Sequence, residues 1–143
     1  MSHSKEFQAF RRKWRRAVDA GLNASSYVYY NEVKLRLAKG YTTGHFVTGN
    51  VLNSVTRSKP ATEQGTRVIK VGTNVKYAAY WEFGFRMRLD LTRYSRATKQ
   101  VTTLQGPARF MRVEHWREAR EAVQDDMRTA FTASFERVLK GEQ

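Results

Sequence analysis

The sequence contains no cysteine, so disulfide bonds, thiol catalysis and thiolate metal sites are all excluded. It also contains no apolar run that approaches the roughly 18 residues of a membrane-spanning helix. The N-terminal stretch is polar and basic and has no apolar centre, which argues against a secretory signal. From these absences we expect a protein that has no membrane partner and that assembles in a cytoplasm.

Motifs for catalysis and for metal binding are missing as well. The three histidines, His3, His45 and His115, do not have the spacing of metal ligands. Neither of the glycine-rich phosphate-binding patterns, GxGxxG and GxxxxGK[ST], occurs. Glu82 could act as an acid or a base, but the sequence places neither a histidine nor a second carboxylate near it. We therefore predict that the protein is not an enzyme and uses no cofactor or metal.

Acidic residues are scarce, because 13 Asp and Glu stand against 26 Lys and Arg, for a net charge of +13. Residues 1–20 carry six basic residues against two acids, and residues 85–112 carry seven against one. Residues 114–140, in contrast, are nearly balanced. A positive charge concentrated in two segments indicates an anionic partner, either a nucleic acid or an acidic protein surface.

The chain is long enough for one folded domain over residues 1–143, and 41% hydrophobic and 13% aromatic residues favour a folded chain. A long N-terminal helix is predicted from about Ser4 to Lys39, with Gly40 as its C-cap. Gly21 interrupts this helix at a cost of about 1 kcal/mol relative to alanine and marks a place for a kink. Its apolar stripe consists of Phe7, Phe10, Trp14, Ala17 or Val18, Tyr27, Tyr30, Val33 or Lys34, and Leu37.

A single helical turn and a β-hairpin are predicted next. Residues 40–54 are rich in turn formers and contain one helical turn around Val51 and Leu52. The hairpin has a first strand that begins at Val55, a loop over residues 60–65 and a β-branched second strand over residues 66–71.

Residues 72–84 begin with a turn signal and have the highest aromatic density in the chain, which predicts a strand or a short helix held against a sheet. The aromatic residues are Tyr77, Tyr80, Trp81 and Phe83. Glu82 lies among them, and an unpaired buried carboxylate is costly. We therefore expect Glu82 to face solvent or to pair with a cation or a backbone N–H.

A protruding arm or a long hairpin is predicted over residues 85–106. In this segment strand-like alternation is followed by polar and basic residues, with few apolar residues that could form a core. A short final strand over residues 108–113 and a C-terminal helix over residues 114–140 follow. This helix carries a core-facing stripe of Trp116, Ala119, Val123, Met127, Ala130 or Phe131, Ser134 or Phe135, and Val138.

Side chains suited to a partner occur in two places. The N-terminal helix carries Arg11, Arg12, Arg15 and Arg16 away from its apolar stripe. They form either a solvated helix face or a partner-binding face. The arm carries Arg86, Arg88, Arg93, Tyr94, Arg96 and Lys99. Its interleaved basic and aromatic residues would also suit phosphate contacts and base stacking.

Three sequence motifs, in order, carry a resemblance to a known family. They are TGNVLNS at residues 48–54, the VGT and EFG triplets at the two ends of residues 71–84, and ARFMR at residues 108–112. With a long helix before them and a C-terminal helix after them, the chain resembles the tail-component or neck proteins of long-tailed bacteriophages. This group includes tail-completion proteins.

The resemblance implies an α+β fold with a long N-terminal helix, a small, mostly antiparallel β-sheet and a C-terminal helix packed on the sheet. It also implies a homo-oligomeric ring, commonly a hexamer, in the neck or at the head-proximal end of the tail. The neighbours would be a tail terminator or tail tube protein and a head-closure or connector protein. Genomic DNA would pass through the ring. The location would be the virion, with the host cytoplasm as the place of assembly.

Two hypotheses for the function remain open. The first is a virion structural protein in which the arm and the N-terminal helix contact other subunits or adjoining rings, and Glu82 and Arg109 pair with each other or with neighbours. The second is a basic nucleic-acid-binding protein that uses the same arginines on phosphate. Salt separates the two, because affinity for nucleic acid falls steeply with salt concentration. An interface with an apolar centre is expected to survive.

Overall fold

The computed structural model has an α+β fold, as the sequence predicts, and the chain is divided between two compact units. Unit 1 comprises residues 1–75 and 115–143, and unit 2 comprises residues 76–114. The structure describes residues 2–42, 49–76, 78–83, 85–87, 90–95, 100–105, 109–111 and 115–141. The prediction of a single domain stays a prediction.

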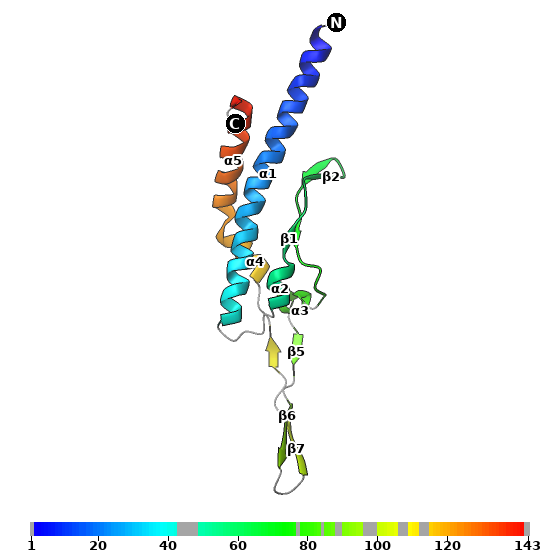
Figure 1. Cartoon of the computed structure of the whole chain (residues 1–143), viewed down its shortest axis with the longest axis vertical. Helices are drawn as coiled ribbons and strands as arrows, with labels where there is room; N and C mark the ends of the chain where they lie inside the picture. Colours follow the sequence, from blue (N-terminus) through cyan, green and yellow to red (C-terminus); the bar gives the residue numbers. More distant parts are fainter. Residues whose placement is uncertain are drawn as a thin grey trace. The chain divides into compact units, whose positions relative to one another are not determined.

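Unit 1 is built around helix α1, Ser2–Thr42, which is longer than the predicted helix at both ends (Figure 1). The expected C-cap at Gly40 is wrong, since the helix continues through it to Thr42. A glycine within a helix costs only about 1 kcal/mol. Burial of Val33 and Leu37 in the preceding turns stabilises the helix by a larger free energy. The helix also continues through Gly21 without a break.

The C-terminal residues form two helices rather than the predicted one. Helix α4, His115–Ala122, is separated from helix α5, Gln124–Lys140, by Val123, whose φ of −113° and ψ of 15° depart from helical values. Val123 is buried, so its side chain still belongs to the predicted core-facing stripe. Helix α5 ends at Gly141, where a φ of 81° lets the glycine N–H reach the carbonyls of Arg137 and Val138.

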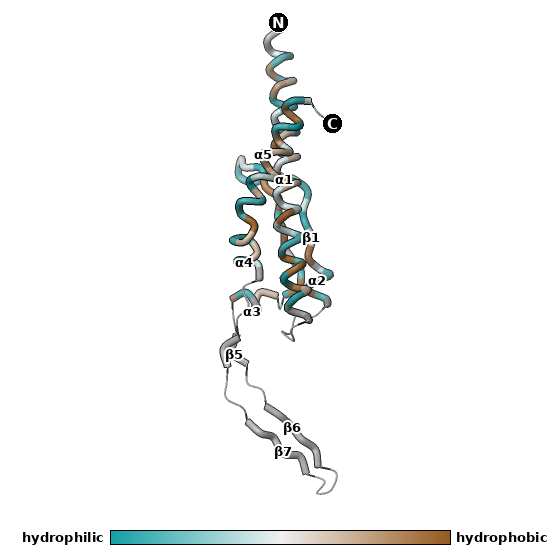
Figure 2. The backbone as a smooth tube through the Cα atoms, turned by 90° about the vertical axis from the view of Figure 1, so that its left-hand side faces the viewer, coloured by the Kyte–Doolittle hydropathy of each residue, from teal (hydrophilic) through white to brown (hydrophobic). Residues whose placement is uncertain are grey.

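The expected packing of the C-terminal helix on a sheet is wrong in detail, because α5 packs along α1 instead. Figures 1 and 2 show the two helices side by side. Trp14 of α1 meets Phe135 of α5 edge to face, with ring centroids 5.0 Å apart.

The predicted hairpin is present in unit 1 as two short antiparallel ladders. Strand β1, Thr56–Arg57, pairs with β4, Val71–Gly72, and β2, Ala61–Glu63, pairs with β3, Thr66–Val68. The expected loop over residues 60–65 is too long, since only Gln64 and Gly65 form the turn. Both have positive φ, 49° and 80°, which is the geometry of a tight type I′ turn. The twist of that turn matches the twist of the strands and lets them pair up to the turn.

Replacing Gly65 with alanine is expected to lower the free energy of unfolding by about 1 kcal/mol, because side chains are strained at positive φ. An added Cβ would meet no atom within 4 Å, so the effect comes from the backbone alone. Gly72→Ala is the matched control, since its Cβ also meets nothing within 4 Å and its φ is not positive. Urea unfolding followed by circular dichroism measures both. Equal stability of the two variants would contradict the assignment of the turn.

The core of unit 1 consists of small side chains where α1 meets helix α2, Gly49–Ser54, and the C-terminal helices. The buried apolar residues described in this unit are Ala17, Val33, Leu37, Val51, Val55, Ala119 and Val123. The single turn predicted around Val51 and Leu52 is thus confirmed as α2. Small side chains let the helices approach closely.

Unit 2 contains helix α3, Ala78–Phe83, and two antiparallel strand pairs. Strand β6, Asp90–Ser95, pairs over its whole length with β7, Gln100–Gln105, which confirms a hairpin in the predicted arm. Strand β5, Phe85–Met87, pairs with β8, Arg109–Met111, the predicted final strand in shortened form. Of the aromatic stretch, Phe83 is largely exposed rather than buried.

Candidate interaction surface

Two arginines of the hairpin attach it to α1. The Arg67 guanidinium donates to both carboxylate oxygens of Asp19, with Nη2 at 2.6 Å from Oδ1 and 2.7 Å from Oδ2, and Nε at 2.9 Å from Oδ1. Nη1 of the same arginine also donates to Thr62 Oγ1 at 3.0 Å. Paired donors on a carboxylate fix orientation as well as distance. The hairpin therefore lies at a defined place beside α1.

Arg57 makes the second attachment. Its Nη1 donates to Ser26 Oγ at 2.7 Å and to the Asn23 carbonyl at 3.0 Å, and its guanidinium lies 4.7 Å from the centroid of the Tyr27 ring. Ser26 is buried, so the arginine supplies a hydrogen bond to a hydroxyl that is shielded from water. Both ends of the hairpin are thus held against α1.

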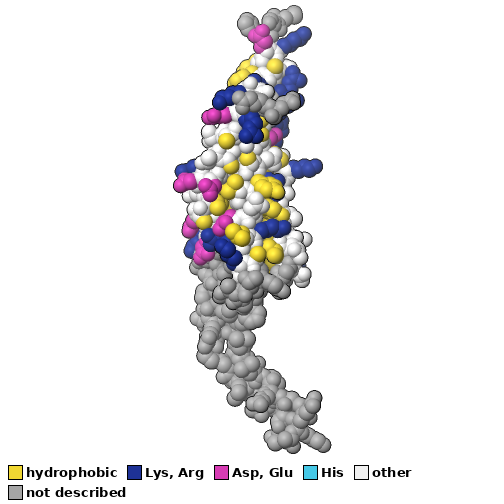
Figure 3. Space-filling model, turned by 60° about the vertical axis from the view of Figure 1, so that its left-hand side comes forward, with side chains coloured by type: hydrophobic (Ala, Val, Ile, Leu, Met, Phe, Trp, Pro, Cys, Tyr) yellow, Lys and Arg dark blue, Asp and Glu magenta, His cyan; other side chains and the backbone are white. Residues whose placement is uncertain are grey.

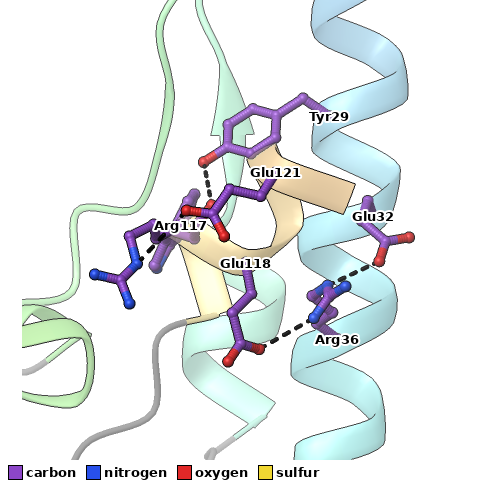
Figure 4. Close-up of polar contacts among 7 residues, drawn as sticks. Tyr29, Glu32, Arg36, Arg117, Glu118 and Glu121 are labelled. Carbon is purple, nitrogen blue, oxygen red and sulfur yellow. Dashed lines mark hydrogen bonds and ion pairs between the residues drawn. The ribbon is translucent and has the colours of Figure 1, made fainter. Parts of the chain in front are cut away.

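Polar contacts also join α1 to α4 (Figure 4). Arg36 donates to Glu32 within α1 at 2.8 Å and to Glu118 of α4 at 3.1 Å. The hydroxyl of Tyr29 donates to the carbonyl of Trp116 at 3.1 Å. These contacts hold α4 against the C-terminal half of α1.

Two of the motifs that carried the resemblance meet in unit 1. The hydroxyl of Ser54, at the end of the first motif, is hydrogen-bonded to the hydroxyl of Thr73 in the second. Ser54 Oγ also donates to the Val51 carbonyl at 2.9 Å, and Thr73 Oγ1 accepts from the Val75 N–H at 3.1 Å. The motif residues therefore join α2 to the end of the hairpin. Thr48 and Gly84, at the outer ends of these motifs, lie outside the described residues.

The N-terminal part of α1 exposes three large aromatic side chains. Phe7 is 62% exposed, Phe10 58% and Trp14 46%, although they lie on the apolar stripe that is buried at Val33 and Leu37. Figures 1 and 2 show the first turns of α1 extending beyond the end of α5. Adjacent exposed apolar side chains of this size usually mark a site of interaction with another molecule.

Arginines and the tip of the hairpin complete a groove beside these rings. The aromatic–arginine groove has a volume of about 580 Å³ and is lined by Phe7, Phe10, Arg11, Trp14, Arg15, Gly65 and Arg67. Arg11, Arg12 and Arg15 line a second hollow of about 330 Å³ together with Gln8. Figure 3 shows basic and hydrophobic side chains next to each other near this end of the molecule.

The arginines of this segment are not neutralised locally. Within the described part of the chain, Arg11, Arg12, Arg15 and Arg16 have no carboxylate partner. Arg12 Nε donates weakly to the Gln8 carbonyl, at 3.4 Å. Arg67, in contrast, is already committed to Asp19. The groove thus offers an apolar floor and two guanidinium groups, of Arg11 and Arg15, with free donors.

The structure brings together only part of the predicted contact set. Arg11, Arg12 and Arg15 line the two hollows, whereas Arg16 is exposed and lines neither. Glu82 is half-buried in α3. Strand residues whose side chains are not described are Arg86, Arg93, Tyr94 and Arg109, and residues wholly outside the described set are Arg88, Arg96 and Lys99. Pairing of Glu82 with Arg109 stays a prediction.

Sequence reasoning missed the structural arginines Arg57 and Arg67. The available signal was Asp19, the sole acid between Glu6 and Glu32 in a strongly basic helix. An isolated acid among cations often has a specific partner, but the sequence does not show which of the many arginines it is.

These features define a small α+β protein with two units, a long helix and an exposed aromatic and basic surface. In the residues described, no group of histidines and acids could hold a metal, and no helix is long and apolar enough to span a membrane. The family model described as "Bacteriophage HK97-gp10, putative tail-component" matches residues 2–84.

The chain therefore belongs to the HK97-gp10-like family of bacteriophage tail components. This confirms the resemblance seen in the sequence. The match includes α1, α2, the hairpin and α3, while the third motif at residues 108–112 lies outside it. Searches among curated proteins and among solved structures gave no significant match.

Proposed function

We propose that this chain is a virion structural protein, a ring-forming tail-completion or neck subunit that joins the tail to the capsid. Membership of a tail-component family supports the location. The observation that carries the proposal is the aromatic–arginine groove. Large exposed rings beside arginines that have no carboxylate partner among the described residues suit a subunit that meets its partner during assembly.

In this proposal the subunits form a closed ring, commonly sixfold, around the channel through which DNA passes. Contacts that join two different surfaces of identical subunits close into rings when the rotation permits. The ring lies between a tail terminator or tail tube protein and a head-closure or connector protein. The subunits remain in the host cytoplasm until they join the virion.

Deleting the gene from the phage that encodes it is expected to give DNA-filled heads and separate tails that do not join. Electron microscopy of the lysate counts joined and separate particles, and expression of the full chain from a plasmid is the control that should restore joining. In intact virions, cryo-electron microscopy is expected to show a ring of this chain between tail tube and connector. Normal joined particles after deletion would overturn the proposal.

The alternative is a nucleic-acid-binding protein, which the unpaired arginines of α1 favour. In that case binding of the purified chain to duplex DNA would weaken steeply with salt, with a slope set by the number of phosphates contacted. Steep salt dependence together with normal head–tail joining after deletion would establish this alternative.

A further inference from the structure

We propose that the aromatic–arginine groove binds an acidic amphipathic helix of another virion protein. This inference rests on the proposed function, because it names the chemistry of the partner through which the subunit joins its neighbours. The groove is formed by α1 and the tip of the hairpin, which all belong to unit 1.

The continuity of one helix face indicates a helical partner. Phe7, Phe10 and Trp14 lie on the stripe of α1 that continues through Gly21, where α5 packs closely. Trp14 still contacts Phe135 of α5, but α5 ends at Lys140 and the first turns of α1 extend past it (Figures 1 and 2). A second apolar helix would continue the packing that α5 begins, with the aromatic side chains as its anchors.

The charge of the same segment indicates that this helix is acidic. Residues 4–16 contain six Lys and Arg and one acid. Arg11 and Arg15 line the groove and have no carboxylate partner among the described residues. Acids at the edge of an apolar helix face would reach these guanidinium groups while its apolar side chains cover the rings.

A second copy of this chain fits the groove less well. A second copy would have to bring acids to Arg11 and Arg15, and it has only 13 Asp and Glu against 26 Lys and Arg. Three acids of the C-terminal helices also lie near cations of the same helix. Glu121 lies 3.8 Å from Arg117, Asp125 lies 3.6 Å from Arg128, and Glu136 lies 3.9 Å from Lys140. A distinct, acidic protein supplies more complementary charge than a chain with twice as many cations as acids.

Nucleic acid also fits less well, because the rings do not form separate stacking platforms. Trp14 presents its plane at 88° to Phe135, and Phe10 lies 6.0 Å from Trp14 at a tilt of 32°. Phe10, Trp14 and Phe135 therefore form one continuous apolar surface. Single-stranded nucleic acid requires open ring faces between which bases can stack, and duplex phosphates gain nothing from an apolar floor.

The first test measures binding of a fluorescent synthetic helix to the full-length protein. The probe is an amphipathic peptide of about 20 residues with leucines on one face and glutamates on both flanks. Fluorescence anisotropy is expected to show binding at least about tenfold tighter than for the same peptide with lysines in place of glutamates. No binding of the acidic peptide, or tighter binding of labelled duplex DNA, would overturn the proposal.

Matched variants then locate the binding site. Phe10→Ser is expected to weaken binding of the acidic peptide by roughly thirtyfold, as for a central aromatic anchor. Arg11→Glu with Arg15→Glu is expected to weaken it by about tenfold or more. Lys5→Glu with Lys13→Glu makes the same change in net charge on exposed positions that do not line the groove, and should retain binding. Equal losses in both charge variants would show unspecific attraction and overturn the site.

The second test identifies the partner in the virion. Phe10 is replaced by photoreactive benzoyl-phenylalanine, virions are purified and irradiated, and the crosslinked peptides are mapped by mass spectrometry. An acidic helix of another virion protein is the expected product. A crosslink to a second copy, a crosslink to DNA, or no crosslink at all would each overturn the docking proposal. None of these outcomes touches the joining experiment, which tests the proposed function alone.

Discussion

Replacing Gly21 with valine is expected to lower the free energy of unfolding of unit 1 by about 3 kcal/mol. A Cβ atom at this position would lie 2.7 Å from Cδ2 and 2.8 Å from Cε2 of the Phe131 ring, and 3.1 Å from its Cγ. These separations are too short, so α1 and α5 would have to move apart or the ring would have to turn. The same ring stacks on Phe135 at 5.7 Å, which limits the second option.

Alanine at the same position separates packing from backbone effects. An alanine in place of glycine should stabilise a helix by about 1 kcal/mol. The clash with Phe131 costs more, so we expect Gly21→Ala to be destabilising by about 1 kcal/mol overall. Asn31→Val and Asn31→Ala are the controls, since Asn31 is exposed on the same helix.

Urea unfolding followed by circular dichroism measures all four variants. The packing explanation also predicts that Phe131→Leu costs less in the Gly21→Ala background than in the natural sequence, because the smaller side chain relieves the contact. A Gly21→Ala variant as stable as the natural protein would show that α1 and α5 are not held at this distance.

Gly21 also shows which parts of the fold a sequence pattern can predict. Spacing of apolar residues predicted α1 and the burial of Val123, because periodicity reports which side of an element is buried. Turn formers and β-branched residues predicted the hairpin of unit 1. Periodicity does not report which element covers the buried side. The resemblance implied that the C-terminal helix packs on a sheet, whereas α5 packs along α1, and the glycine that permits this close approach lies in α1.

The candidate site was predictable to a similar extent. The exposure of Arg11, Arg12, Arg15 and Arg16 follows from their place away from the apolar stripe. The exposure of Phe7 does not, since an apolar stripe looks the same whether its cover comes from the same chain or from a partner. The hairpin side of the groove could not be predicted from the sequence either, because Asp19 and Arg67 are 48 residues apart.

Asp19→Ala is expected to lower the free energy of unfolding of unit 1 by about 2 kcal/mol, since Arg67 would lose a paired, charge-assisted contact. The side chains of Arg67 and Asp19 are 20% and 28% exposed, so solvent screens this pair less than a surface pair. Glu63→Ala is the control on the same hairpin. Its pair with Lys70 is largely exposed, and removing it should change stability by less than about 0.5 kcal/mol.

Because Arg67 and Gly65 also line the aromatic–arginine groove, loss of this ion pair should affect binding as well as stability. Hydrogen exchange followed by mass spectrometry is expected to show faster exchange over residues 61–68 in Asp19→Ala than in Glu63→Ala. The acidic peptide should bind several-fold more weakly to Asp19→Ala, since the free Arg67 no longer holds the hairpin wall beside Phe10.

Arg67→Lys separates charge from geometry, because lysine keeps the charge but cannot make the paired contact. If Arg67→Lys exchanged and bound like the natural protein, the hairpin would be held by charge alone and the groove would not depend on this contact.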